Sequence, residues 1–142
     1  RNNGFSELIK RRFVIGSFSL LSENANELFI RAQKCRRLIV DAFNKVFENY
    51  DAIYCPASPS TAPLKDNVSD TLSNEYLIAD NYLAYGNMGG FPSITLPIGF
   101  ENGLPFGANL TAKPFDESNL LKIANSLEKA TGLSSLVAGK EK

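Results

Sequence analysis

Residues 89–99 read GGFPSITLPIG, and they are followed by GLPFG at 103–107, ANLTA at 108–112 and KPFDE at 113–117. The β-branched run at 93–96 lies between prolines, which predicts a buried strand. The glycines and prolines from 99 to 107 predict a hairpin turn, and 108–112 predicts the strand that returns from it. Asp116 predicts the start of a final helix, because aspartate is a favoured N-cap residue. The stretch therefore predicts a strand, a turn, a second strand and a capped helix.

Two segments show the three- and four-residue spacing of apolar residues that is typical of an amphipathic helix. The first begins near Asn24, where Glu27 follows three residues later as in a capping box, and extends to Asn49. Its apolar stripe comprises Leu28, Ala32, Cys35, Ile39, Ala42, Phe43 and Val46. The second is the final helix, which Gly132 should end. Its stripe comprises Leu120, Ile123, Ala124 and Leu127.

The remaining segments complete the predicted order of elements. A short helix is expected from Phe5 to Arg12, followed by a loop or turn, and a buried strand over 51–56. Residues 57–73 are rich in Ser, Pro, Thr and Asp, which indicates a long surface loop. Residues 75–88 are expected to form one helix or two, and residues 134–142 a flexible tail. Helices that alternate with strands in this way predict an α/β fold.

The composition excludes several kinds of chemistry. The 142 residues include no histidine, which excludes Ser-His-Asp and Cys-His catalysis and histidine zinc sites within the chain. The formal net charge of zero gives no support for nucleic-acid binding through a basic face. Cys35 and Cys55 are interpreted as two reduced structural thiols, as expected of a cytoplasmic protein. No apolar run approaches the roughly 20 residues that a membrane span needs.

Four blocks, in this order and spacing, resemble the amidase-signature family: RRFVIGSF at 11–18, RAQKCRRLI at 31–39, FENYDAIYCPASP at 47–59, and residues 89–117. Within that family the chain most resembles the branch that forms the A subunits of bacterial glutamyl-tRNA(Gln) amidotransferases. The resemblance implies the C-terminal part of the amidase-signature fold, a mixed β-sheet layered with helices. Residues 1–142 would then be the C-terminal segment of a single domain whose catalytic N-terminal part is absent. Ile53, Ile94, Leu96 and Leu110 would lie on strands that lose covering elements of that domain.

The resemblance also implies the activity of the complete protein. In this family a serine attacks the side-chain amide of glutamine, and a second serine and a lysine transfer the proton. The ammonia released is used by a partner subunit to convert Glu-tRNA(Gln) to Gln-tRNA(Gln). The implied partners are the B and C subunits of a heterotrimer, with tRNA reached only indirectly. No cofactor is expected in this chain, and ATP and Mg are expected to be used by the partner subunit.

The resemblance assigns two residues of this chain to the substrate and none to catalysis. Arg12 matches the arginine that holds the α-carboxylate of glutamine, and its planar guanidinium suits a carboxylate. Asp80, twelve residues before Pro92, matches the aspartate that holds the α-ammonium group. The serine–lysine machinery of the family lies upstream of the matching region, so the isolated chain is expected to be inactive. A fragment of a general amidase, or an interaction domain without catalysis, remains an alternative.

Overall fold

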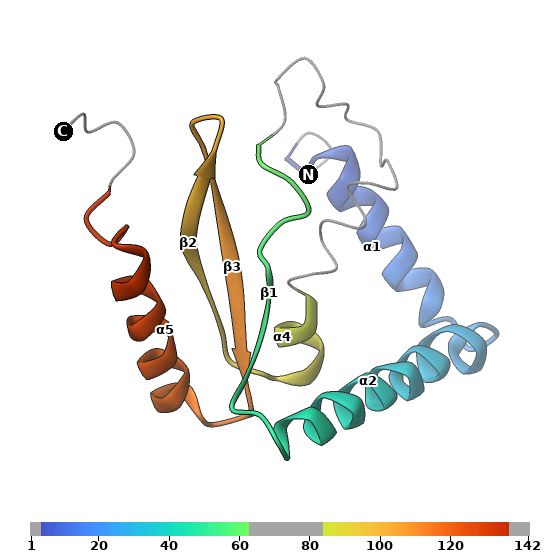
Figure 1. Ribbon diagram of the computed structural model, residues 1–142. Coiled ribbons are helices and arrows are strands. Elements are labelled where there is room, and N and C mark those ends of the chain that lie inside the picture. Colours follow the sequence, from blue (N-terminus) through green and yellow to red (C-terminus); the bar gives the residue numbers. More distant parts are fainter. Residues whose placement is uncertain (1–3, 63–83, 137–142) are drawn as a thin grey trace. The chain divides into compact units, whose positions relative to one another are not determined.

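The computed structural model describes residues 4–62 and 84–136, and the chain divides into two compact units, 1–42 and 43–142 (Figure 1). The first contains helix α1 (Glu7–Ser19), a π-helical turn η1 (Ala25–Ile30) and most of helix α2 (Arg31–Phe47). The second contains the end of α2, β1 (Ala52–Pro56), α4 (Ala84–Gly89), β2 (Ser93–Glu101), β3 (Leu104–Ala112) and α5 (Glu117–Thr131). The α/β fold class predicted from the sequence is confirmed.

The three strands of the second unit form an antiparallel sheet in the order β1-β3-β2 (Figure 1). Strands β2 and β3 are joined by Asn102 and Gly103, whose φ angles of 51° and 78° are those of a two-residue hairpin turn. Both strands are therefore longer than the sequence predicted, because the predicted turn over 99–107 is confined to these two residues. Gly99 and Gly107 lie within the strands, and a register irregularity occurs between Pro97 and Gly99.

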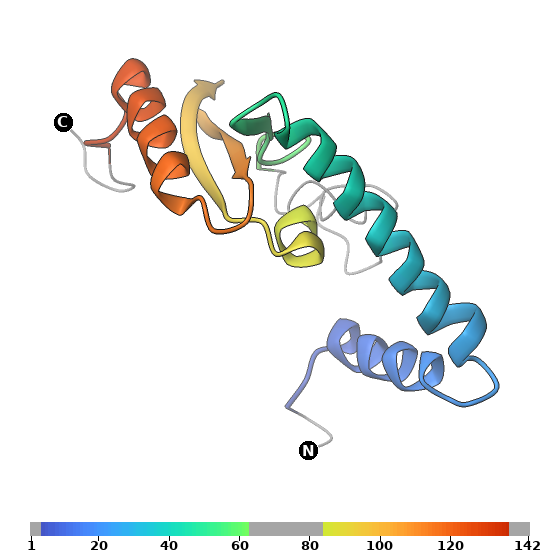
Figure 2. The same ribbon diagram turned by 90° about the horizontal axis from the view of Figure 1, so that it is seen from below.

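Helix α5 covers one face of the β2–β3 hairpin (Figure 2). The core between them consists of Leu96, Leu110, Ala112, Leu120 and Ala124, with Ile94, Ile123 and Leu127 packed against it. The predicted stripe of the final helix is thus confirmed, and Gly132 ends this helix with a left-handed φ of 66°. The expectation that Leu96 and Leu110 would be uncovered is wrong, because α5 buries both side chains.

Helix α1 differs from its prediction. It continues to Ser19 through the segment 13–19, which was expected to be a loop. The apolar run Phe13-Val14-Ile15 is compatible with a helix, and Gly16 alone does not end it, since glycine costs only about 1 kcal/mol in a helix interior. Asn24 does not cap the next helix through its side chain, and its amide donates to the carbonyl oxygen of Phe18 at 3.1 Å.

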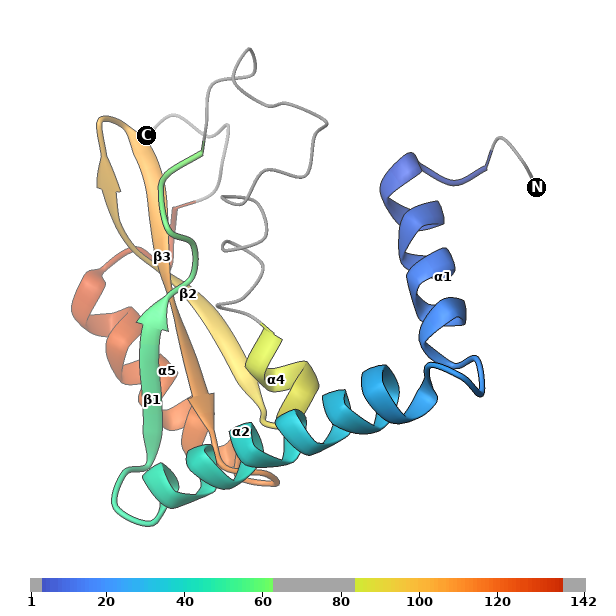
Figure 3. The same cartoon turned by 90° about the vertical axis from the view of Figure 1, so that its right-hand side faces the viewer.

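The first unit has no buried core of its own. None of the described residues 4–42 is buried, whereas the second unit buries the residues between α5 and the sheet. Figure 3 shows α1 and the start of α2 as separate helices joined by a short connection, and η1 runs directly into α2. None of the described helices is long and apolar enough to cross a membrane. Of the tail predicted at 134–142, residues 137–142 lie outside the described part of the chain.

Candidate functional site

Of the two residues predicted to bind substrate, Arg12 lies within the described part of the chain. Arg12 lies in the middle of α1 and is exposed within the first unit. Leu8 and Ile9 precede Arg12 by about one turn of α1, and Ile15 follows it by about one turn. Asp80 lies outside the described residues. Arg12 is chemically able to bind a carboxylate through two parallel hydrogen bonds.

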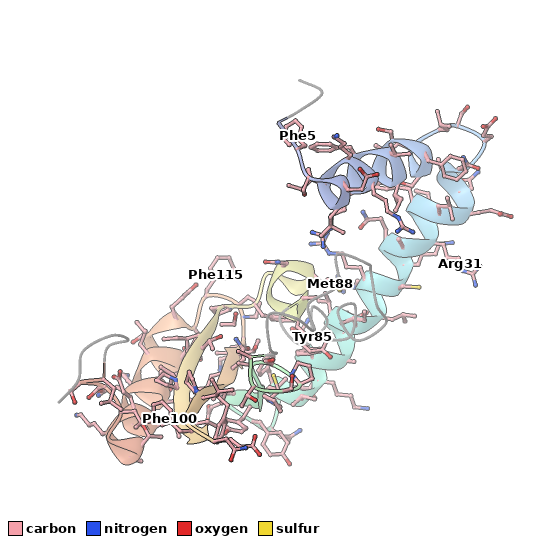
Figure 4. The ribbon with its side chains drawn as sticks, turned by 90° about the horizontal axis from the view of Figure 1, so that it is seen from above. Phe5, Arg31, Tyr85, Met88, Phe100 and Phe115 are labelled. Carbon is pink, nitrogen blue, oxygen red and sulfur yellow. The ribbon has the colours of Figure 1, made fainter. Side chains whose placement is uncertain are left out.

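An aromatic cluster joins the end of α2 to the turn that precedes β2. Phe91 stacks on Phe43 with ring centroids 5.3 Å apart and contacts Phe47 at 5.6 Å, while Tyr85 of α4 lies 4.8 Å from Phe43. Figure 4 shows Tyr85 with Met88 on the short helix α4. These contacts fix the start of β2, where the amide of Ala112 also donates to the carbonyl of Pro92 at 3.0 Å.

The sheet face opposite α5 carries a row of polar side chains that the sequence analysis missed. The Asn109 amide donates to Thr95 Oγ1 at 3.0 Å, and the Thr111 hydroxyl donates to Asn109 Oδ1 at 3.1 Å. Asn109 and Thr111 are buried, and no buried side-chain polar atom of the described residues lacks a hydrogen bond. The alternation of Thr95, Asn109 and Thr111 with apolar neighbours could have revealed this row, since strand residues alternate between faces. Because its bonds are satisfied internally, the row positions the strands rather than offering a binding group.

Cys55 lies on the same face of the sheet as this row, since it pairs directly with Asn109. Partial burial raises the pKa of its thiol, which keeps it protonated and unreactive at neutral pH. Cys35 is exposed, and neither cysteine forms a disulfide. Within the described residues no group of three or more His, Cys, Asp or Glu side chains could hold a metal ion. The candidate functional residue in the described part of the chain is thus Arg12 on α1.

Comparison with known proteins decides the family. A sequence profile for the family described as Amidase matches residues 1–121. The chain belongs to the amidase-signature family. Its amidase-signature relatives include the A subunit of the glutamyl-tRNA(Gln) amidotransferase of Staphylococcus saprophyticus, 40% identical over 130 residues that make up 90% of this chain. The corresponding A subunit of Thermotoga maritima is 38% identical over 129 residues, or 91% of this chain.

Solved structures of amidase-signature proteins agree with the fold. The crystal structure of the Thermotoga maritima A subunit superposes on 91% of this chain and 28% of that chain, with a TM-score of 0.69 and 39% identity. A bacterial aryl acylamidase of the same family superposes with a TM-score of 0.67 at 18% identity, over 89% of this chain and 26% of that chain, which shows the fold alone. The chain spans about a quarter of the length of the curated relatives it matches, 26% for the first and 27% for the second. The matched part of these relatives is their C-terminal part.

Proposed function

We propose that this chain is the C-terminal portion of a glutamine-hydrolysing amidotransferase subunit. The observation that supports this is an identity of 36–40% over at least 90% of the chain to proteins named as A subunits of glutamyl-tRNA(Gln) amidotransferases. The complete protein would release ammonia from glutamine, and the B and C subunits would use it to convert Glu-tRNA(Gln) to Gln-tRNA(Gln). The ATP and Mg needed for that second step would be bound by the partner subunit, in the cytoplasm.

In this proposal the chain forms a wall of the glutamine site and the nucleophile comes from the portion that precedes it. The guanidinium of Arg12 donates two hydrogen bonds to the α-carboxylate, and the carboxylate of Asp80 accepts from the α-ammonium group. Together they orient the side-chain amide of glutamine towards the attacking serine oxygen. Such orientation lowers the activation free energy because the reacting atoms no longer have to find one another.

The position of Arg12 on α1 supports its proposed role. Apolar residues one turn before and after Arg12 would desolvate its guanidinium once another surface covers the helix. The planar guanidinium of Arg12 suits a carboxylate such as that of a zwitterionic amino acid. A general amidase, whose substrate has no α-charges, would need neither Arg12 nor Asp80. A free-standing interaction domain would need a closed core, which the described part of the first unit lacks.

The test is a hybrid of the Thermotoga maritima A subunit in which this chain replaces the matching segment, assembled with its partner subunits. We expect Arg12→Ala and Asp80→Asn each to raise the KM for glutamine about tenfold to a hundredfold. Loss of one charged hydrogen bond typically costs about 1.5–3 kcal/mol. Amidation with free ammonium should be unchanged, because that route bypasses the glutamine site.

The matched control is Arg11→Ala, which removes a neighbouring cation of α1 that the proposal leaves without a role. This variant should retain the KM of the parent hybrid. Equal glutamine use by all three variants would contradict the assignment of Arg12 and Asp80. Loss of both the glutamine and the ammonium routes would show that these residues are structural.

A further inference from the structure

The formal net charge of zero is divided unevenly between the two units. Residues 1–42 contain eight lysines and arginines against four aspartates and glutamates, whereas residues 43–142 contain seven against eleven. The first unit therefore has a formal net charge of +4 and the second a formal net charge of −4. A surplus of cations on one unit creates a local potential that attracts anions, although the charge of the whole chain is zero.

Three cations of the first unit lie along one side of α2. Successive residues of an α-helix are about 100° apart, so Arg31, Lys34 and Arg37 fall within a sector of about 120°. All three residues are exposed, and the side chain of Arg31 projects from the helix in Figure 4. These three residues form the basic face of α2, which is separate from the apolar stripe of this helix.

The carboxylate nearest to the basic face is that of Asp41. Arg37 Nε lies 3.0 Å from Asp41 Oδ1, and the two side chains are 74% and 50% exposed. Exposed ion pairs of this kind contribute little free energy and are weakened by salt. Arg37 can therefore exchange this partner for another anion, and a phosphate accepts two parallel hydrogen bonds from a guanidinium.

The residues of this sector favour a nucleic-acid backbone over a protein as the partner. A protein interface has a core of apolar side chains. Between residues 31 and 42, all of which the structure describes, Leu38 is the one large apolar residue in the sector, and it is 70% exposed. Binding of phosphate groups needs cations and no apolar core, and arginine and lysine commonly supply the contacts.

We infer that the basic face of α2 contacts the phosphate backbone of the tRNA on which the complete amidotransferase acts. This inference rests on the proposed function, and it differs from the expectation that tRNA is reached only indirectly through the complex. The names of the relatives indicate which nucleic acid is involved, since they specify a glutamyl-tRNA(Gln) amidotransferase. Phosphate contacts carry no sequence information, so the face would add affinity and orientation without selecting among tRNAs.

The experiment uses the Thermotoga maritima hybrid assembled with its partner subunits. Fluorescence anisotropy measures the binding of a labelled tRNA(Gln) transcript over a range of salt concentrations. We expect the triple variant Arg31→Ala, Lys34→Ala and Arg37→Ala to bind about tenfold to a hundredfold more weakly at low salt. The slope of log K against log salt concentration should decrease by about three, because each lost phosphate contact removes about one. Glutamine hydrolysis without tRNA should be unchanged.

The matched control replaces Lys113, Lys122 and Lys129 of the second unit with alanine. These are likewise three exposed cations, and one of them forms an ion pair, between Lys113 Nζ and Asp116 Oδ2 at 3.7 Å. This control should keep the affinity and the salt dependence of the parent hybrid. Replacement of both arginines of the basic face with lysine should also retain most of the affinity, because the positive charges remain.

Four results would overturn the inference. Unchanged tRNA binding by the triple variant, in a hybrid that still amidates Glu-tRNA(Gln), would overturn it and leave the proposed function intact. A parent hybrid that binds no tRNA would overturn both. Loss of the partner subunits from the triple variant in size-exclusion chromatography, with tRNA affinity retained, would identify an acidic protein surface as the partner. Equal weakening in the triple variant and the lysine control would show only a non-specific effect of net charge.

Discussion

At the scale of single residues, Phe115 has a strained backbone conformation and a side chain that is not buried in its unit. Its φ angle is 63°, in the left-handed region, where a bulky residue is strained. Phe115 is 96% exposed, and its ring points away from the rest of the second unit in Figure 4. The ring therefore contributes no burial in this unit to offset the strain. Asn102, at a φ of 51° in the hairpin turn, shows the kind of residue that accepts this conformation.

We predict that Phe115→Asn raises the free energy of unfolding of the isolated chain by about 0.5–1 kcal/mol. Asparagine tolerates the left-handed region, so part of the backbone strain of about 1–2 kcal/mol is relieved. Urea denaturation followed by circular dichroism would measure the change. Phe100→Asn is the control, since Phe100 is an exposed aromatic residue in the strand β2 and its replacement should destabilise the chain. A loss of stability with Phe115→Asn would show that the ring makes a stabilising contact.

At the scale of elements, the turn between α4 and β2 depends on a close approach of Phe91 to Gly89. A Cβ atom at Gly89 would collide with the ring of Phe91, which is itself 4% exposed and stacked on Phe43. The backbone amides of Gly90 and Phe91 both donate to the carbonyl of Gly86, at 2.9 and 3.2 Å. The Phe91 ring packed against Gly89 and these two hydrogen bonds together hold the turn between α4 and β2.

We predict that Gly89→Ala lowers the free energy of unfolding of the second unit by about 1–3 kcal/mol, because overpacking a core displaces rings or backbone. Thermal unfolding monitored by near-ultraviolet circular dichroism would report the change in aromatic packing. Gly16→Ala is the contrasting control, since a Cβ at Gly16 of α1 meets no atom within 4 Å. It should increase helix content, because alanine is favoured over glycine in a helix interior. Equal effects of the two substitutions would refute the role of Phe91.

At the scale of the whole molecule, the chain contains one unit with a core and one without. The second unit buries a hairpin against α5, while none of the described residues of the first unit is buried. The family comparisons provide a reason, because the chain corresponds to about a quarter of its relatives. The surface that α1 would bury in such a relative remains exposed within its own unit.

We predict that the isolated chain releases no ammonia from glutamine. It contains no histidine, and its sequence has no Gly/Ser-rich run that matches the nucleophile region of the family. A coupled assay of ammonia release with purified chain should match a buffer blank and a heat-denatured sample. Turnover above both controls would show that the chain contains a complete catalytic site, and the proposed division of labour would be wrong.

The sequence by itself determined the elements whose signals are local. The stripe from Leu120 to Leu127 and Gly132 marked α5 correctly, because an apolar face and a left-handed helix end each depend on neighbouring residues. Asp116 directly precedes the helix as predicted, but its carboxylate makes no capping hydrogen bond and accepts from Asn119 Nδ2 at 3.4 Å instead. Local signals also predicted the strand that ends at Pro56 and the order of helices and strands along the chain. The four motif blocks also identified the family, which the profile match over residues 1–121 confirms.

Only the tertiary structure decided which residues distant in sequence pack against one another. The buried row of Thr95, Asn109 and Thr111 exists because antiparallel register brings residues distant in sequence to one face. The extension of α1 beyond Arg12 was missed because an apolar run is compatible with helix or loop until its surroundings are known. Arg12 can be placed on α1, but its role stays a prediction that local signals could not settle. Contacts between distant residues depend on packing free energy summed over the whole fold, and no short stretch of sequence contains that sum.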